Sequence, residues 1–327
     1  MPAPVRPLLA LAFVAGAVSL ATAQPVQPAP GGPGPGQGAA IGRGQPAASA
    51  RGAPAAQGFT PAGAPLPVPS QVAIPRPAPE EYAQINAAID AFIAADRSAT
   101  KPLLDKYHPV ITVRPPRANP GIAPSINYAY FPKHENNLAT ITAMNGEIDL
   151  MIMGDSITDG WRNGGKAVYD QYYAPLKTAN FGIGGDTTQG VLWRLQNGEG
   201  QGFKPKAIML LIGTNNSGSG TSAEIAEGVG AVVLELRKDF PAAKILLLAI
   251  FPRSDKEIQK QLVAAANPII ARLHDGEHVF YFDIGQKFLA ADGTITRDIM
   301  ADGLHPTAKG YAIWAEAVKD KLAELMK

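Results

Sequence analysis

Apolar residues gather in five short runs between positions 148 and 283 of the chain. Most of these runs lack the strict alternation of a half-exposed strand, and continuous runs are typical of strands covered on both faces in a parallel sheet. Helical spacing occurs between them, as in Ile225, Val229, Val232 and Leu236, which recur every three or four residues. We expect strands over 148–153, 178–181, 207–212, 244–251 and 279–283.

Strands that alternate with helices predict an α/β fold. We expect a three-layer α/β/α sandwich with a central five-stranded parallel sheet, whose strands are joined by right-handed crossovers. Further helical patterns cover 80–96 and 308–326, and a helix within 128–144 should end near Asn145-Gly146. We assign the sandwich to residues 126–327 and a helical, irregular leader to residues 80–125.

The first 79 residues have a different character. A short segment with Arg6 precedes an apolar stretch over 8–20, and Ala21-Thr22-Ala23 follows. This is the order of a secretory signal peptide, and we expect it to span residues 1–23. As a helix the apolar stretch covers about 20 Å, less than the ~30 Å of a bilayer core. The sequence therefore predicts a periplasmic or secreted protein with no membrane span after cleavage.

Residues 24–79 contain 14 prolines and 10 glycines among 56 residues. A segment so poor in large apolar side chains cannot offset the entropy of ordering the chain. We therefore expect this Pro/Gly/Ala-rich stretch to be a disordered linker.

Composition and charge exclude several classes of protein. The 327 residues are 46% hydrophobic, which suits a globular core. Lys and Arg number 29 against 28 Asp and Glu, a formal charge of +1, and no basic run occurs. No nucleic-acid partner is therefore expected. The chain has no cysteine, and this excludes disulfides, thiolate metal sites and cysteine nucleophiles.

Four polar clusters hold the candidate chemistry, and the carboxyl ends of parallel strands are where function gathers in such sheets. Three of them directly follow a predicted strand and the fourth precedes the last helix. They are Gly154-Asp155-Ser156-Ile157-Thr158-Asp159, Gly182-Ile183-Gly184-Gly185-Asp186-Thr187, Gly213-Thr214-Asn215-Asn216 and Asp302-Gly303-Leu304-His305-Pro306.

These clusters contain every group that acyl transfer needs. A serine hydroxyl becomes a good nucleophile when a base removes its proton, and the base works best when an acidic partner orients it. Ser156, His305 and Asp302 are the candidates for these three roles. Negative charge that develops on the carbonyl oxygen needs preplaced donors. Backbone N–H groups of Ser156 and Gly185 and the amide of Asn215 are candidates for this oxyanion hole.

The four clusters, in this order, resemble the sequence blocks of the SGNH (GDSL-type) hydrolase superfamily. Within it, Asn180-Phe-Gly-Ile-Gly-Gly-Asp-Thr-Thr, Val191-Leu-Trp-Arg-Leu and Asn197-Gly-Glu resemble the catalytic subunits of platelet-activating factor acetylhydrolase Ib. The resemblance covers about residues 126–327. It implies a flavodoxin-like fold, a Ser156–His305–Asp302 triad and an oxyanion hole of Ser156, Gly185 and Asn215. It implies no metal and no organic cofactor.

Each candidate residue also has a structural interpretation. Ser156 would suit a helix N-cap, and Asn215 would suit a turn. Asp302 would favour the N-terminus of the last helix, and His305 would suit a backbone contact. Asp155 and Asp159 are expected to order the Ser156 loop rather than to act in catalysis.

Three further candidate roles rest on weaker patterns. A nucleotide site after the second strand is disfavoured, because Thr187 stands where the dinucleotide fingerprint requires its third glycine. His274 and His278 are four residues apart, but no third metal ligand lies near them in the sequence. Trp193 and Arg194 lie beside the Gly185 loop in sequence and are candidates for the pocket wall.

The sequence thus predicts an exported serine esterase that hydrolyses short-chain acetyl esters of a carbohydrate or a similar O-acetylated substrate. The alternatives are a lysophospholipase or thioesterase for longer acyl chains, and a non-catalytic module that binds acylated glycan. A homodimer remains open, because no sequence pattern here marks such an interface.

Overall fold

The computed structural model describes residues 58–115 and 117–327, so the expected signal peptide and most of the expected linker lie outside the described residues. Five parallel strands form its sheet in the order β2-β1-β3-β4-β5. Their bounds are β1 Leu150–Gly154, β2 Thr178–Gly182, β3 Ala207–Leu211, β4 Lys244–Leu248 and β5 Val279–Phe282. The five-stranded parallel sheet is confirmed, although β1 begins two residues later and β4 ends three residues earlier than expected.

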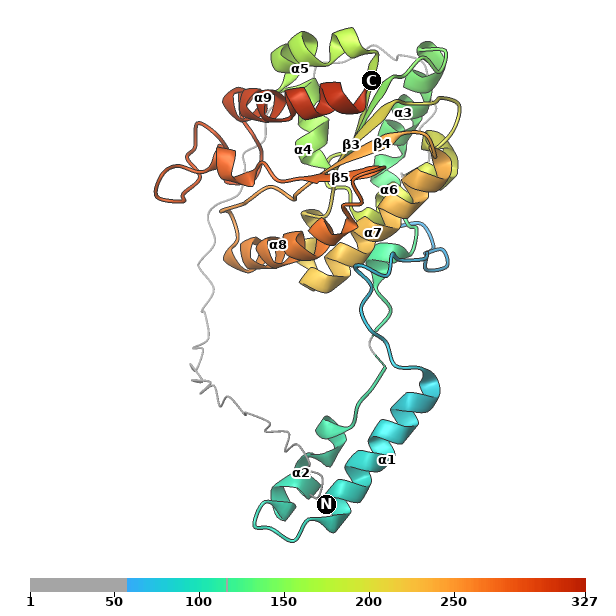
Figure 1. Ribbon diagram of the computed structural model, residues 1–327, viewed down its shortest axis with the longest axis vertical. Helices are drawn as coiled ribbons and strands as arrows, with labels where there is room; N and C mark the ends of the chain where they lie inside the picture. The colour runs from blue at the N-terminus through green and yellow to red at the C-terminus, as the bar shows by residue number, and fades with distance from the viewer. Residues whose placement is uncertain (1–57, 116) are drawn as a thin grey trace, which may run out of the picture. The chain divides into compact units, whose positions relative to one another are not determined.

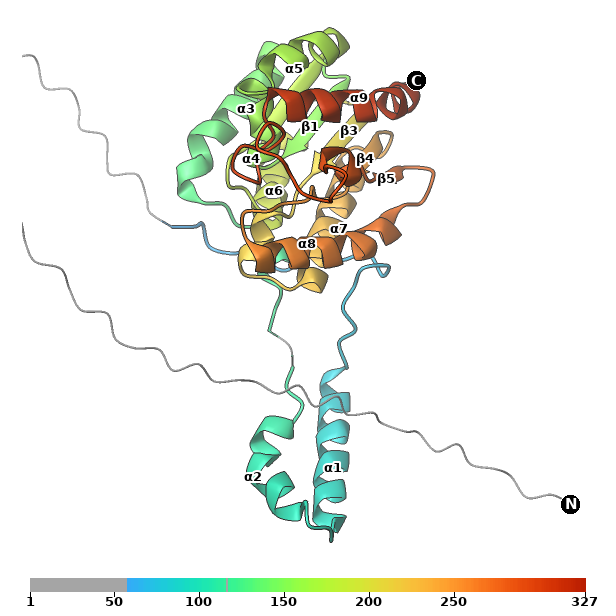
Figure 2. The same ribbon diagram turned by 90° about the vertical axis from the view of Figure 1, so that its left-hand side faces the viewer.

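Helices cover both faces of this sheet (Figures 1 and 2). The helices α6 (Thr188–Arg194), α7 (Ser222–Asp239) and α8 (Glu257–Ile270) pack on one face. The helices α4 (Ser156–Asp159), α5 (Lys166–Tyr172) and α9 (Ala308–Leu325) lie on the other. The predicted three-layer α/β/α sandwich is therefore confirmed.

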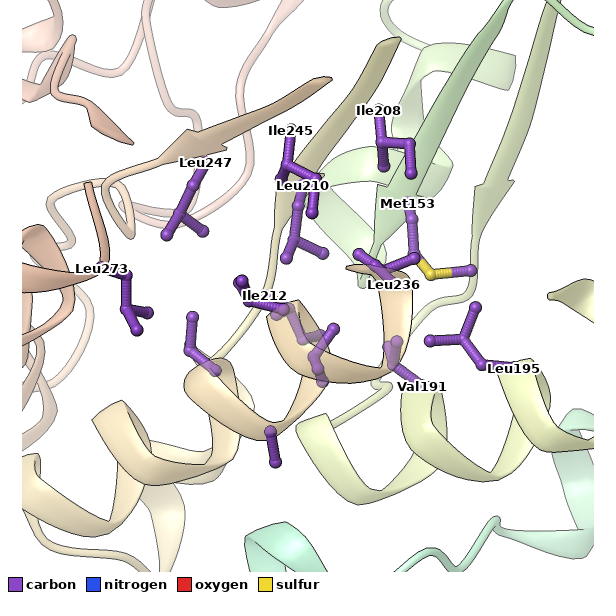
Figure 3. Close-up of a cluster of buried hydrophobic side chains, with 14 of the residues drawn as sticks. Met153, Val191, Leu195, Ile208, Leu210, Ile212, Leu236, Ile245, Leu247 and Leu273 are labelled. Carbon is purple, nitrogen blue, oxygen red and sulfur yellow. The ribbon is translucent and has the colours of Figure 1, made fainter. Parts of the chain in front are cut away.

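The strands are buried on both faces, which explains their continuous apolar sequences. Along β1, Met151 and Met153 point into the core on the α7 side, while Leu150 and Ile152 point into the core on the α9 side. Figure 3 shows the first of these cores, where side chains of β3 and β4 meet those of α6 and α7. Because successive strand residues face opposite sides, both faces need apolar residues and no polar alternation remains.

Helix α3 (Phe131–Ala143) ends where the sequence predicts. Asn145 and Gly146 have φ values of 51° and 70°. Their N–H groups bond to the carbonyls of Thr142 and Ile141, both at 3.0 Å, in the pattern of a Schellman cap. The remaining short elements are the 3-10 helices Pro120–Ile122, Tyr128–Tyr130, Gly160–Arg162, Ala174–Leu176, Asn215–Gly218, Ala271–Leu273 and Gly285–Phe288, and a π-helical turn over Leu195–Glu199.

The leader contains two helices, α1 (Pro79–Ala95) and α2 (Lys101–Ile111). The side chain of Asn86 in α1 exchanges two hydrogen bonds with the backbone of Val113, just after α2. In the part of the chain that the structure describes, the hydrogen bonds of residues 78–114 stay within this segment. Among the described residues, no helix is both long enough and apolar enough to cross a membrane.

Residues 58–76, here called the strap, fall within the stretch expected to be disordered, yet they lie against the sandwich. Backbone hydrogen bonds join Thr60 to Ile126 and Leu66 to Ile122, at 2.9 and 2.8 Å. Val72 is 3% exposed and belongs to the core on the α7 side. The strap is held by this burial and by backbone bonds, neither of which its proline-rich composition reveals.

Candidate active site

Ser156 lies where β1 turns sharply into α4. Gly154 ends the strand, and any side chain there would collide with the carbonyl of Leu211 and the hydroxyl of Thr158. The Asp155 carboxylate accepts a hydrogen bond from the Ile157 N–H at 3.0 Å and so caps α4. The interpretation of Ser156 as the N-cap is therefore wrong, because Asp155 fills that position and leaves the Ser156 hydroxyl available.

His305 and Asp302 reach Ser156 from a loop near the other end of the domain. The Asp302 Oδ1 atom accepts hydrogen bonds from the N–H groups of Leu304 and His305 at 3.0 and 2.8 Å. Its Oδ2 atom lies 2.6 Å from His305 Nδ1. The other ring nitrogen, Nε2, lies 2.9 Å from the Ser156 Oγ. The Asp302 carboxylate, the His305 imidazole and the Ser156 hydroxyl thus form one hydrogen-bonded chain.

The two carboxylates of the site have opposite electrostatic environments. Burial would raise the pKa of Asp302, but the backbone and ring N–H groups of His305 and the N–H of Leu304 outweigh it and lower this pKa to about 2. Asp302 is therefore a carboxylate throughout the neutral range. Complete burial raises the pKa of Asp155 to about 7, against the hydrogen bond from Ile157 and with help from the charge of Asp186.

Gly185 occupies the third position of a tight turn beside Ser156. The Asp186 N–H bonds to the Ile183 carbonyl at 3.1 Å, and Gly185 has a φ of 82°, as a type II turn requires. This turn uses the Asp186 N–H, so the Gly185 N–H belongs to the central peptide and is left to donate elsewhere. A methyl group at Gly184 would lie 4.0 Å from the Ser156 Cβ, so the turn borders the nucleophile.

Asn215 lies at the start of the 3-10 helix after β3 and next to the same turn. Its Nδ2 donates a hydrogen bond to the Asp186 carbonyl at 2.7 Å. An amide NH₂ group has two protons, so the second proton remains available to an anion. The turn-forming interpretation and the oxyanion interpretation of Asn215 are therefore compatible in this geometry.

Other candidate residues make structural contacts. Arg194 is fully buried in ion pairs with Asp186 and Glu199, so its expected place in a pocket wall is wrong. Trp193 packs against Phe131 and His134 of α3. Asp159 pairs with Lys133 and Arg162, in keeping with its expected role in ordering the loop. The described residues hold no group of three His, Cys, Asp or Glu side chains suited to a metal ion.

The sequence is similar to proteins of a known family. Over 195 residues it is 34% identical to platelet-activating factor acetylhydrolase IB subunit alpha2 of Homo sapiens, covering 59% of this chain and 84% of the relative. Residues 152–313 match the model of the GDSL-like Lipase/Acylhydrolase family. The chain belongs to this family. The alpha2 subunit of Gallus gallus is 36% identical over 183 residues, which cover 55% of this GDSL hydrolase and 79% of the relative.

A GDSL-like lipase from Bacteroides thetaiotaomicron superposes with a TM-score of 0.49 at 16% identity, covering 58% of this chain and 97% of that one.

Sequence reasoning assigned no role to Asn216 or to the contact between His134 and Glu199. Asn216 accepts a hydrogen bond from the Thr188 N–H at 3.0 Å and donates to its hydroxyl at 3.0 Å. His134 is buried and bonds to Glu199 at 2.8 Å. One pattern in the sequence could have indicated the buried ion pairs of Arg194. This residue interrupts an otherwise apolar helical stretch of Val191, Leu192 and Leu195.

Proposed function

We propose that this GDSL hydrolase is an exported serine esterase that removes acetyl groups from a carbohydrate or a similar O-acetylated substrate. Ser156 acts as the nucleophile, His305 as the general base and acid, and Asp302 as the partner that orients the imidazole. The observation that carries the proposal is the contact of His305 with both other groups, at 2.6 Å to Asp302 and 2.9 Å to Ser156.

In the first half of the reaction, His305 Nε2 takes the hydroxyl proton of Ser156 while Oγ bonds to the acyl carbon. The carbonyl π electrons move onto oxygen, and this oxyanion accepts hydrogen bonds from the N–H groups of Ser156 and Gly185 and from Asn215 Nδ2. When the carbonyl re-forms, the ester C–O bond breaks, and His305 gives its proton to the departing alkoxide. An alcohol leaves and an acyl-enzyme remains.

In the second half, a water molecule takes the place of the alcohol. His305 accepts a proton from the water as its oxygen bonds to the acyl carbon, and the same donors hold the second oxyanion. The bond to Ser156 Oγ then breaks, the serine recovers its proton from His305, and the carboxylic acid leaves. Asp302 stays ionised throughout and stabilises the imidazolium, because its pKa of about 2 lies far below neutral pH.

Two observations support the choice of an acetyl group and of a substrate outside the cytoplasm. The relatives with more than 30% identity carry the name acetylhydrolase, which favours an acetyl group. The predicted signal peptide over residues 1–23 favours a substrate outside the cytoplasm. Acetylated polysaccharide suits both, since it carries acetyl esters and lies outside the cell membrane.

The first test is turnover of an aryl acetate by the purified wild-type protein and by Ser156→Ala. We expect hydrolysis by the wild type and loss of essentially all of it in the variant. Equal rates in the two proteins would exclude a Ser156 nucleophile. A series of aryl esters from acetate to palmitate then measures acyl preference. A maximum at long chains would replace the acetylesterase proposal with the lysophospholipase or thioesterase alternative.

The second test identifies the alcohol part of the substrate. Acetate release is measured from a panel of acetylated glycans, with Ser156→Ala as the control. Release by the wild type alone supports a glycan substrate. Retention of the protein on the glycans without acetate release would support the non-catalytic binding module instead.

A further inference from the structure

A buried ion-pair cluster adjoins two of the three proposed oxyanion donors, the Gly185 N–H and the Asn215 amide, through Asp186. The Arg194 guanidinium is 0% exposed and stands between the carboxylates of Asp186 and Glu199, which are also buried. Its Nε donates to Asp186 Oδ2 at 2.9 Å, and a terminal nitrogen donates to the Phe181 carbonyl at 3.0 Å. His134 is hydrogen-bonded to the Glu199 carboxylate at 2.8 Å. Arg194 is thus tied to the end of β2 as well as to both carboxylates.

Fold stability alone is a poor explanation for this cluster. Taking three charges out of water costs several kcal/mol per ion, and a well-packed apolar set of similar volume is often as stable. The pKa of Arg194 stays raised despite its burial, because the two carboxylates favour the charged form. Arg194 therefore keeps its charge, while burial raises the pKa of Asp186 against the attraction of Arg194.

Asp186 connects the cluster to both donors. It follows Gly185 directly, and its N–H closes the turn that presents the Gly185 N–H. Its carbonyl accepts the hydrogen bond that orients the Asn215 amide, at 2.7 Å. Gly190 of α6 allows this arrangement, because any side chain there would collide with the Asp186 carboxylate.

We infer that Arg194 and Asp186 are positioning residues, which set the orientation of both oxyanion donors without touching the substrate. This inference rests on the proposed function. The guanidinium fixes the Asp186 side chain, and the Asp186 backbone in turn fixes the Gly185 peptide and the Asn215 amide. A donor must lie within hydrogen-bond distance of the place where the oxyanion forms, so a small rotation of Asp186 weakens transition-state binding more than substrate binding.

The test is steady-state kinetics with an aryl acetate for two variants. Asp186→Asn keeps the side-chain shape but loses the ion pair. Arg194→Lys keeps a buried positive charge, so it serves if Asp186→Asn does not fold, but a single ammonium cannot replace the fork that spans two carboxylates. We expect each folded variant to lose at least about tenfold in kcat with KM little changed.

A double-mutant comparison separates positioning from general loosening. Asp186→Asn should cost less in kcat when Asn215 is already alanine than in the wild type, because one of the two groups that it orients is gone. Arg76→Lys is the matched control, since it makes the same replacement beside a buried carboxylate, Glu227, away from Ser156. We expect the control to keep the wild-type kcat.

The outcomes are distinct. If Ser156-dependent turnover occurs and the folded Asp186→Asn and Arg194→Lys variants keep the wild-type kcat, the inference is wrong and the proposed function stands. If kcat falls by the same factor in both Asn215 backgrounds, Asp186 does not act through Asn215 and that half of the inference is wrong. If kcat falls as far in Arg76→Lys, the cluster has only a structural role. Absence of Ser156-dependent turnover in the wild type overturns the proposed function, and the positioning role with it.

Discussion

Asn215 is the residue of the proposed oxyanion hole that donates through its side chain. Its amide is oriented by the Asp186 carbonyl, so alanine removes one donor and leaves the backbone donors in place. We expect Asn215→Ala to lower kcat by ~10²–10³, as deletion of an oxyanion donor does elsewhere. Steady-state kinetics with an aryl acetate measures this. A rise in KM at constant kcat would assign Asn215 to substrate binding instead.

Asp155 makes stability depend on pH. Its pKa of about 7 in the folded protein exceeds the value of about 3.9 for an exposed aspartate, so between these pH values the folded state binds a proton that the unfolded state has lost. Stability therefore falls as pH rises from about 4 to 7, by roughly 4 kcal/mol in total. Asn at this position can still cap α4 but does not ionise. We expect Asp155→Asn to remove this dependence.

The measurement is the free energy of unfolding in urea at pH 4.5 and at pH 7.5. The variant should gain several kcal/mol over the wild type between the two pH values, by the same linkage. Asp170→Asn, at an exposed side chain on α5, is the control and should follow the wild type. Parallel curves for Asp155→Asn and wild type would show that Asp155 is ionised in the folded protein at both pH values.

The contact of Ser156, His305 and Asp302 was predictable from the sequence. The buried contacts of Arg194 and His134 were not. Ser156, His305 and Asp302 are the residue types that acyl transfer needs, and their clusters were expected at one edge of the sheet, so a shared location was predictable. Arg194 reaches Glu199 within one short stretch of chain, whereas His134 reaches the same carboxylate only because α3 packs against the turn over Leu195–Glu199. Their residue types alone permit a surface role equally well.

At the scale of elements, the strap is held to α7 by one ion pair. Arg76 donates to both Glu227 oxygens, at 2.6 and 2.8 Å, and the Ile74 N–H bonds to the same carboxylate at 2.8 Å. Burial would raise the pKa of Glu227, but the bonds from Arg76, Ile74 and Asn119 outweigh it and lower this pKa. The Glu227 side chain is 0% exposed, so it depends on these partners for its charge.

We expect Arg76→Met to destabilise the protein by about 2 kcal/mol, because it leaves a buried carboxylate short of partners. The strap should also become more accessible to protease. Thermal unfolding and limited proteolysis measure the two effects. The double variant Arg76→Met/Glu227→Gln removes the buried charge and should recover part of the loss. Equal stability of Arg76→Met and wild type would show that the strap contributes little.

Elements of regular structure were predicted better than their attachments. All five strands were located because covered parallel strands need continuous apolar runs, and the end of α3 was located because Asn-Gly favours a left-handed cap. The strap forms no regular element, so no periodicity marks it. Its attachment depends on Glu227 and on the contact of Val72 with α7 at Gly230, which lie some 150 residues further along the chain.

At the scale of the whole molecule, the sheet order explains how distant residues meet. Strand β1 lies between β2 and β3, so the turn after β2 and the helix after β3 flank the Ser156 loop on its two sides. The loop before α9 then adds His305 from the far end of the chain. This convergence follows from a parallel sheet with ligand sites at its carboxyl edge, and it was predictable in outline.

The same view predicts that the α1–α2 pair can be removed. Arg76 and Arg117, on either side of it, bind Glu227 and Glu224, which lie one turn apart on α7. In the described part of the chain, the hydrogen bonds of residues 78–114 stay inside that segment. A flexible linker of about ten residues can span the gap between the two arginines, because an extended chain covers about 3.3 Å per residue.

We expect a variant with residues 78–114 replaced by such a Gly/Ser linker to keep the wild-type kcat on an aryl acetate and a similar midpoint of thermal unfolding. A second variant that also lacks the strap should unfold at a lower temperature, because it removes the buried Val72 from the core and leaves Glu227 without Arg76. If the first variant loses stability as much as the second, α1 and α2 support the catalytic sandwich through contacts beyond their own pair. Because the strap is intact in one variant and absent in the other, the comparison assigns any stability loss to one of the two segments.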